Sequence, residues 1–214
     1  MRKIFISILV CSFVFLSAYK NVNATSTIDG SYEVDIIDAL ENPEKYPNAS
    51  VKKYNSTEFK EVIKNDRNMS EEAKNEILQE ISQNDKLRAG AYDYINLTAK
   101  CKVTDNYYCY PYFYAYTYFG GPSHEPSKIA KILNANIDRN YYGTSKQFSG
   151  DLYYNLESER CIYWDVNGDF YNNGTTSVGL GGQIGIGEDT HVSFSVSSSS
   201  NHYSYCNQHG RFRI

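Results

Sequence analysis

The chain has 214 residues, with 21 basic and 25 acidic side chains and a formal net charge of −4 at neutral pH. A length of this order forms one or two domains and is sufficient to bury a hydrophobic core. Nucleic acids and anionic membrane surfaces recruit proteins through basic patches, so the acidic balance argues against both as electrostatic partners.

The first 24 residues have the three parts of a secretory signal. Arg2 and Lys3 form a basic start, residues 4–18 form an apolar run, and residues 22–24 end on Ala24, where a signal peptidase would cleave. The apolar run is shorter than the roughly 20 residues that a membrane-spanning helix needs. We therefore expect residues 1–24 to be removed and the protein to be secreted, with a retained anchor as the alternative.

Residues 25–100 are rich in charge and carry apolar residues at helical spacing. Ser56 or Thr57 is suited to cap one helix and Ser70 the next. The spacing predicts three helices, around residues 36–40, 57–63 and 71–81. We expect a helical N-terminal region over 25–100, leading into a strand near its end, with removal as a pro-segment as an open alternative.

Tyrosine occupies every second position of residues 108–118. Side chains alternate between the two faces of a strand, so the pattern predicts one face of phenols, with Cys109 and Phe113 on the other face. A tyrosine ring joins a flat apolar surface to a polar tip, which suits contact with sugars or proteins. The expected binding residues are Tyr108, Tyr110, Tyr112, Tyr114, Tyr116 and Tyr118. The alternative is that the helices pack on this face and leave its hydroxyls at the rim.

Residues 101–214 show the short alternating segments of an antiparallel domain. A short helix is expected from Pro126 to residue 133, and Asn167-Gly168 is typical of a two-residue hairpin turn. The predicted fold class is α+β, with a helical N-terminal segment followed by an antiparallel β-meander or sandwich-like domain.

Four cysteines remain after removal of the signal. An even number in an exported chain indicates two disulfides among Cys101, Cys109, Cys161 and Cys206. The favoured pairing joins Cys101 to Cys109 and Cys161 to Cys206. A zinc site is the alternative, although the spacings match no zinc module.

Residues 175–200 alternate apolar residues with glycine and serine. Membrane hairpins of pore-forming toxins have this texture, and so do half-buried strands of a β-sandwich. The segment therefore leaves open a pore-forming or bacteriocin-like toxin, for which a membrane would be the partner.

Metal and catalytic signals are weak. Residues 165–169 begin like a calcium-binding loop but lack its later glycine and glutamate. His191, His202 and His209 would need to gather to hold a metal, and isolated surface histidines are the favoured explanation. No nucleophile, metalloprotease or phosphate-binding motif is present, and carboxylate pairs in residues 157–169 leave a secreted hydrolase as a further alternative.

The leading expectation is a secreted protein that binds without catalysis, outside the cell or at the cell envelope. Its partner would be a glycan, a cell-wall polymer or another protein, and no cofactor or metal is expected. The face of alternating tyrosines would make the contact.

Overall fold

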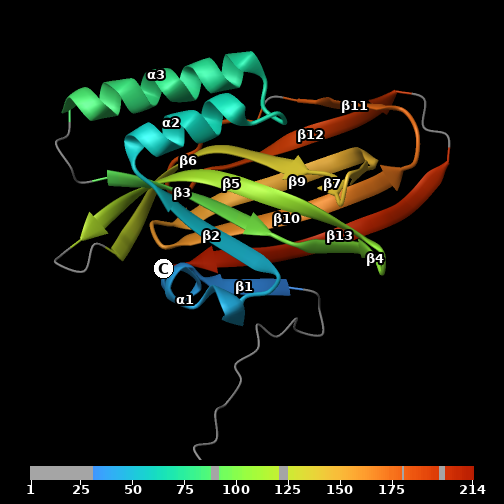
Figure 1. Cartoon of the computed structure of the whole chain (residues 1–214), viewed down its shortest axis with the longest axis horizontal. Helices are drawn as coiled ribbons and strands as arrows, with labels where there is room; N and C mark the ends of the chain where they lie inside the picture. The colour runs from blue at the N-terminus through green and yellow to red at the C-terminus, as the bar shows by residue number, and fades with distance from the viewer. Residues whose placement is uncertain (1–30, 88–91, 121–124, 180, 198–200) are drawn as a thin grey trace, which may run out of the picture.

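The computed structural model describes residues 31–87, 92–120, 125–179, 181–197 and 201–214, and the expected signal at 1–24 lies outside them. These residues are mostly β, arranged in two main sheets with three α-helices (Figure 1). The prediction of a helical N-terminal segment followed by a β-domain is wrong. Strands β1 (Ser31–Asp35), β2 (Ala49–Tyr54) and β3 (Tyr92–Ala99) of that region belong to the sheets.

The larger sheet has six strands in the order β1-β13-β10-β9-β12-β11. Its members after β1 are β9 (Gln147–Ser158), β10 (Cys161–Tyr171), β11 (Thr175–Val178), β12 (Asp189–Ser197) and β13 (His202–Arg213). Strand β1 runs parallel to β13, whereas the other neighbours are antiparallel. The first and last described strands of the chain therefore lie side by side.

The smaller sheet is built around β5 (Tyr107–Gly120), the strand that carries the tyrosines. Strands β3, β4 (Cys101–Thr104) and β6 (Glu125–Asp138) all pair with β5, and β2 adds to β3. The face of β5 opposite the tyrosines is the inner one, and its residues Cys109 and Phe113 are buried between the two sheets, as predicted.

The helix expected from Pro126 is instead part of β6. The pairing of β6 with β5 shifts register three times, and at each shift one residue of β6 has no partner residue on β5. Such bulges return apolar residues to the same face after three positions rather than two. Ile129 and Ile132, both fully buried, are spaced in this way, so the strand imitates a helical pattern.

The predicted turn at Asn167-Gly168 is also wrong, because β10 continues through both residues. Gly168 lies opposite Gly150 of β9. A Cβ atom on Gly168 would come within 2.4 Å of the Ser149 carbonyl oxygen. Glycine is therefore required at position 168 because the backbones of β9 and β10 come close together there, and not because the chain turns.

The three predicted helices are present as α1 (Ile36–Glu41), α2 (Ser56–Asn65) and α3 (Glu71–Leu87). Asn55, rather than Ser56 or Thr57, caps α2: its side chain accepts a hydrogen bond from the Glu58 amide, and the Glu58 carboxylate accepts one from the Asn55 amide. Ser70 caps α3 through the Ala73 amide.

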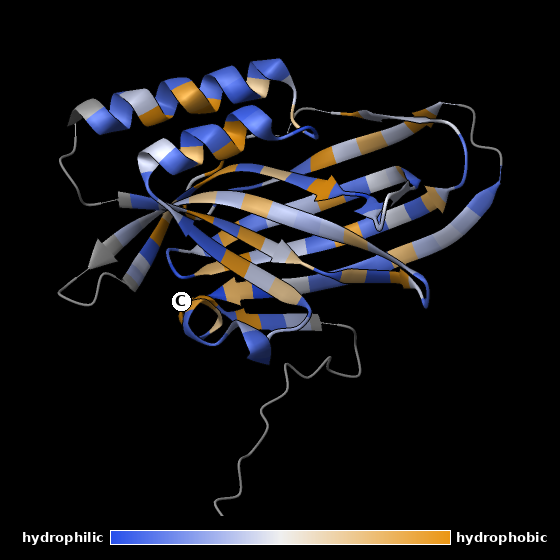
Figure 2. Ribbon diagram, viewed as in Figure 1, coloured by the Kyte–Doolittle hydropathy of each residue, from blue (hydrophilic) through white to orange (hydrophobic). Residues whose placement is uncertain are grey.

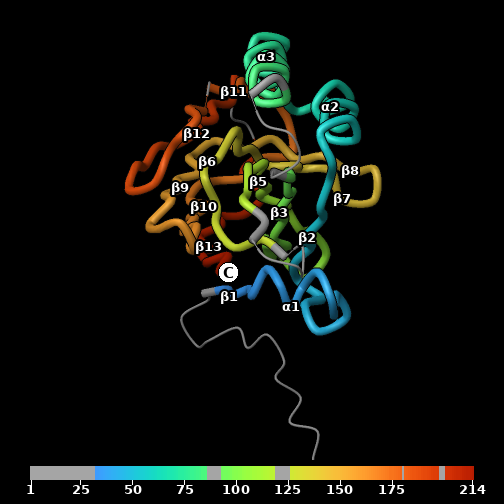
Figure 3. The backbone as a smooth tube through the Cα atoms, turned by 90° about the vertical axis from the view of Figure 1, so that its left-hand side faces the viewer, coloured from blue at the N-terminus to red at the C-terminus, as the bar shows by residue number. Residues whose placement is uncertain are grey.

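The layers are a helix pair, the smaller sheet and the larger sheet (Figure 3). Helices α2 and α3 show bands of hydrophobic and hydrophilic residues (Figure 2), as helices with one face on a sheet do. One core fills the space between the sheets, where Phe113 meets Tyr154 and Phe212 at ring distances of 6.0 Å. A second core lies between the smaller sheet and the helices. No helix among the described residues is long and apolar enough to cross a membrane.

Candidate functional site

The tyrosines of β5 divide into a covered part and a partly exposed part. Tyr112, Tyr114 and Tyr116 are only 5–6% exposed and pack against α2 and α3 in the second core. Tyr108, Tyr110 and Tyr118 keep intermediate exposure. A binding face of six exposed phenols is therefore not formed, and the helices cover the middle of the row.

Phe59 of α2 accounts for much of this covering. Its ring stacks on Tyr94 of β3 at 4.5 Å and meets the Tyr114 ring edge-on at 5.5 Å. The helix therefore docks on the sheet through aromatic contacts, which add to the stabilisation from buried area.

Asp66, at the end of α2, satisfies two of the covered hydroxyls. Its Oδ2 atom accepts hydrogen bonds from Tyr112 at 2.7 Å and from Tyr114 at 2.9 Å, while Oδ1 accepts from the Asn68 amide at 2.8 Å. Burial, followed by the negative charge of Asp66, raises the pKa of both Tyr112 and Tyr114. The two phenols therefore remain protonated donors that fix the end of α2 on the sheet.

A cleft of about 720 Å³ opens beside this carboxylate. The end of α2 and the segment after it form one wall, and strands β3, β5 and β6 form the floor. The lining side chains are mostly amides, carboxylates and phenols: Val62, Asn65, Asp66, Arg67, Asn68, Asn96, Thr98, Tyr110, Tyr112, Tyr114, Asp138 and Asn140. Such a surface offers many directional hydrogen bonds beside aromatic rings.

A small hairpin extends the aromatic surface from the rim of the cleft. It consists of β7 (Asn140–Tyr141) and β8 (Thr144–Ser145). The Tyr141 ring lies 6.5 Å from Tyr110, 5.2 Å from Tyr108 and 4.5 Å from Tyr142. Tyr110 and Asn140 both line the cleft, so the rings and the cleft form one continuous surface.

Tyr142 stands at the turn of this hairpin and is 92% exposed. Its φ angle is +48° and that of Gly143 is +79°. Asn140 supports the turn, because its side-chain oxygen accepts a hydrogen bond of 2.9 Å from the Gly143 amide. Positive φ at both residues matches the favoured two-residue hairpin turn, so the turn accounts for this backbone. The turn leaves the Tyr142 ring exposed beside Tyr141, where it could contact a ligand.

Sequence reasoning missed two of these features. Asp66 had no signal, because it is an ordinary acidic residue at a helix end. The rim had a signal that was overlooked: Asn140-Tyr141-Tyr142-Gly143 places two tyrosines beside the glycine of a tight turn.

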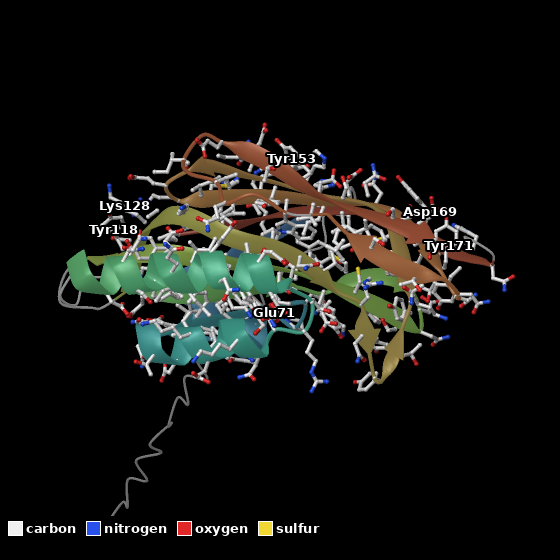
Figure 4. All side chains as sticks on the ribbon, turned by 90° about the horizontal axis from the view of Figure 1, so that it is seen from above. Glu71, Tyr118, Lys128, Tyr153, Asp169 and Tyr171 are labelled. Carbon is white, nitrogen blue, oxygen red and sulfur yellow. The ribbon has the colours of Figure 1, made fainter. Side chains whose placement is uncertain are left out.

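The remaining tyrosine of the row lies far from the cleft. Tyr118 lies beside Lys128, its strand partner, at the end of the molecule opposite Asp169 and Tyr171 (Figure 4). It does not line the cleft.

The three histidines considered as metal ligands do not gather in one place. His191 lies on β12 and His202 on β13, which are separated by β10 and β9 in the larger sheet. His202 instead contacts Asp169 at 2.8 Å, and His209 lies opposite Asp165. Within the described ranges, no group of three or more His, Cys, Asp or Glu side chains is placed to hold a metal ion.

The carboxylates considered for hydrolysis also lie outside the cleft. Glu157 binds Arg211 and Glu159 binds Lys128. Asp165 and Asp169 lie on β10 of the larger sheet, in the other layer of the molecule.

Within the described part of residues 175–200, the segment considered for membrane insertion, strands β11 and β12 belong to the larger sheet. Strand β11 contains four residues, and β12 buries Val192 and Phe194 in the core between the sheets. The alternation in β12 therefore matches a half-buried strand here.

The cysteines form one group and one separate thiol. Cys101 of β4 lies opposite Cys109 of β5, and both are buried with Cys206 in the core between the sheets. Cys161 lies elsewhere, with its thiol 3.1 Å from the Glu157 carboxylate. Burial, with that carboxylate as the next cause, raises the pKa of Cys161 to about 11. All four are free thiols in this structure.

The favoured pairing of Cys161 with Cys206 does not fit the strand register. On neighbouring strands β10 and β13, Cys161 lies opposite Arg213 whereas Cys206 lies opposite Gly168. Seven residues of strand separate the two positions, roughly 24 Å at about 3.4 Å per residue.

Comparison of the chain with protein-family models, with curated proteins and with solved structures finds no match.

Proposed function

We propose that this protein is exported and binds a saccharide polymer, such as a cell-wall polymer, without catalysing a reaction. The observation that carries the proposal is the continuous surface formed by the cleft and the rings of Tyr110, Tyr141 and Tyr142. Sugar rings have apolar faces that suit tyrosine and hydroxyls that suit amides and carboxylates. Ligand sites commonly combine aromatic surface with a few placed polar groups in this way.

The lining of the cleft favours an uncharged, hydroxyl-rich ligand. Carboxylates at Asp66 and Asp138 are balanced in part by Arg67, and the other polar side chains include the amides of Asn65 and Asn96. A strongly anionic or cationic ligand would meet like charge in this surface, whereas hydroxyl groups find both donors and acceptors.

The role of Asp66 supports binding rather than hydrolysis. Its carboxylate already accepts three hydrogen bonds, from two phenols and one backbone amide. Glycoside hydrolysis ordinarily uses two carboxyl groups on either side of the scissile bond, one of them free to donate a proton. Asp66 is instead positioned as a structural anchor of the cleft wall.

The test is retention on insoluble cell-wall polymer and on glycan arrays. Tyr110→Ala and Tyr142→Asn each remove one ring, and asparagine tolerates the positive φ of residue 142. We expect each variant to lose about tenfold in affinity, the size of a moderate interface hot spot. Tyr205→Ala is the matched control, because Tyr205 is 54% exposed but lies on β13, away from the cleft.

Equal retention of Tyr110→Ala, Tyr142→Asn and the wild type would disprove the proposed site, provided that circular dichroism shows the variants folded. Release of reducing sugar ends by the wild-type protein would contradict the non-catalytic part of the proposal.

A further inference from the structure

The hairpin that carries Tyr141 and Tyr142 forms a sheet of its own. Its strands β7 and β8 pair Asn140 with Ser145 and Tyr141 with Thr144, outside the two main sheets. A two-stranded hairpin is marginally stable by itself. The place of this hairpin beside the cleft must therefore depend on side chains that contact its two ends.

Tyr107, the first residue of β5, joins the two ends of the hairpin through its hydroxyl. The hydroxyl donates a hydrogen bond to the carbonyl oxygen of Arg139, just before β7, and accepts one of 3.0 Å from the Lys146 amide, just after β8. The Tyr107 ring is only 2% exposed and meets Tyr141 edge-on at 6.2 Å and Phe170 of the larger sheet at 5.8 Å. One buried residue thus holds the ends of the hairpin together and fixes them to the core between the sheets.

Arg139 makes a second link at the same place. Its Nη1 atom donates to the Lys146 carbonyl oxygen at 3.2 Å and to Thr176 Oγ1 of β11 at 2.6 Å. The guanidinium group therefore connects both ends of the hairpin to the larger sheet. Side-chain hydrogen bonds here do what a main-chain ladder does where a hairpin pairs with a neighbouring strand.

We propose that Tyr107 and Arg139 are positioning residues for the ligand surface: they hold the hairpin where the rings of Tyr141 and Tyr142 continue the cleft. Tyr107 is buried, so it acts through the hairpin and does not touch the ligand. The effect on affinity rests on the proposed saccharide site, whereas the effect on the order of the hairpin is a property of the protein without ligand.

The first experiment is limited digestion of the full chain with chymotrypsin in the absence of ligand. Tyr142 is exposed, but a protease needs a locally opened segment, so the rate of cleavage after Tyr142 measures opening of the hairpin. Tyr107→Phe keeps the ring and removes the hydroxyl. We expect this variant to raise the cleavage rate about tenfold, since it leaves the two hydrogen-bonding groups at the hairpin ends without their partner. Arg139→Gln should raise the rate as well.

Tyr154→Phe is the matched control for this digestion. Tyr154 is fully buried, and its hydroxyl donates to the Gly182 carbonyl oxygen at 2.6 Å, so the variant loses the same kind of hydrogen bond outside the hairpin. Cleavage after Tyr142 should keep its wild-type rate. Equal rates in Tyr107→Phe and Tyr154→Phe, with both variants folded by circular dichroism, would overturn the proposal. If Tyr107→Phe does not fold, Arg139→Gln takes its place in the comparison.

The second experiment measures retention on insoluble cell-wall polymer and on glycan arrays in two backgrounds. Because Tyr107 acts through the hairpin rings, Tyr107→Phe should weaken binding about fivefold in the wild type and by a smaller factor in Tyr142→Asn. Equal factors in both backgrounds would overturn the positioning role. If the wild type itself is not retained on any of these glycans, the saccharide proposal fails, and the cleavage rates still decide whether Tyr107 and Arg139 order the hairpin.

Discussion

The hydroxyl of Tyr112 donates a hydrogen bond of 2.7 Å to the carboxylate of Asp66, across 46 residues of sequence. Tyr114 donates to the same oxygen atom. One acidic side chain at the end of a helix thereby satisfies two phenols that would otherwise lie unpaired beneath that helix.

Replacement of Asp66 by alanine should lower the free energy of unfolding by about 1–3 kcal/mol, because it leaves two buried hydroxyls without their acceptor. Urea unfolding followed by tyrosine fluorescence measures the change. Asp66→Asn keeps one acceptor oxygen and should lose less. Asp105→Ala is the control, because Asp105 is 87% exposed and pairs with Lys102 at the surface, so its replacement should leave the free energy of unfolding nearly unchanged. Equal stability of Asp66→Ala and Asp105→Ala would refute the anchoring role.

Gly168→Ala should destabilise the larger sheet. The added Cβ would lie 2.4 Å from the Ser149 oxygen and 2.7 Å from the Gly150 Cα, both of them backbone atoms that cannot rotate away. Overpacking of this kind costs about 1–3 kcal/mol, measured as a lower midpoint of thermal unfolding. Gly182→Ala, where the nearest atom to the new Cβ lies at 3.7 Å, should leave the midpoint nearly unchanged. Two variants with the same midpoint would show that β9 and β10 do not approach closely at Gly168.

The ion pair of Glu157 with Arg211 should make stability depend on acidity. Arg211 donates to both carboxylate oxygens at 3.0 Å, and this contact is the main cause that lowers the pKa of Glu157 below 4.5. A lowered pKa stabilises the fold above the unfolded-state value of 4.5, and the contribution is lost as pH falls through the folded-state value. The pair is about one-third exposed, so the effect should not exceed about 1 kcal/mol. In urea unfolding, Glu157→Gln should weaken the protein at pH 7 and match the wild type near pH 2; a constant difference at both pH values would contradict this account.

Asp165 should have the opposite effect on stability from Glu157, because its ionisation should destabilise the fold. Burial raises its pKa above 3.8, partly offset by His209 opposite, and one of its oxygens is buried without a hydrogen-bond partner. A raised pKa means that ionisation opposes folding, so the penalty is absent below pH 3.8 and complete above the folded-state pKa. Asp165→Asn should therefore be more stable than the wild type at pH 7, by up to about 1 kcal/mol, and should lose that advantage near pH 3. A variant that is less stable at pH 7 would argue against an unpaired charge at this position.

Local patterns were sufficient for the helices and for the two faces of β5, because the residues that determine them are close in the sequence. The same reasoning failed for β6, where bulges imitate helical spacing. It missed β1, a five-residue strand whose partners are residues 209–213. Strand pairing over such a separation has no local signature.

The candidate site also combines residues that local patterns predict with residues that only long-range contacts bring together. Tyr110 belongs to the predicted row and lines the cleft. Tyr112 and Tyr114 belong to the same row but are covered by α2 and α3, an arrangement that alternation alone cannot distinguish from exposure. Asp66 and Tyr142 join the site through tertiary packing, so only the folded chain brings them to Tyr110.

The parallel pairing of β1 with β13 has a consequence for the timing of folding. Residues 31–35 leave the ribosome early, yet the strand that receives them, with Ser31 opposite His209 and Asp35 opposite Arg213, is made more than 170 residues later. Contacts that join distant parts of a chain form slowly, because a long loop must close first. Strand β1 therefore stays without its partner while residues 36–208 are synthesised, and the six-stranded sheet is completed only after β13 has emerged.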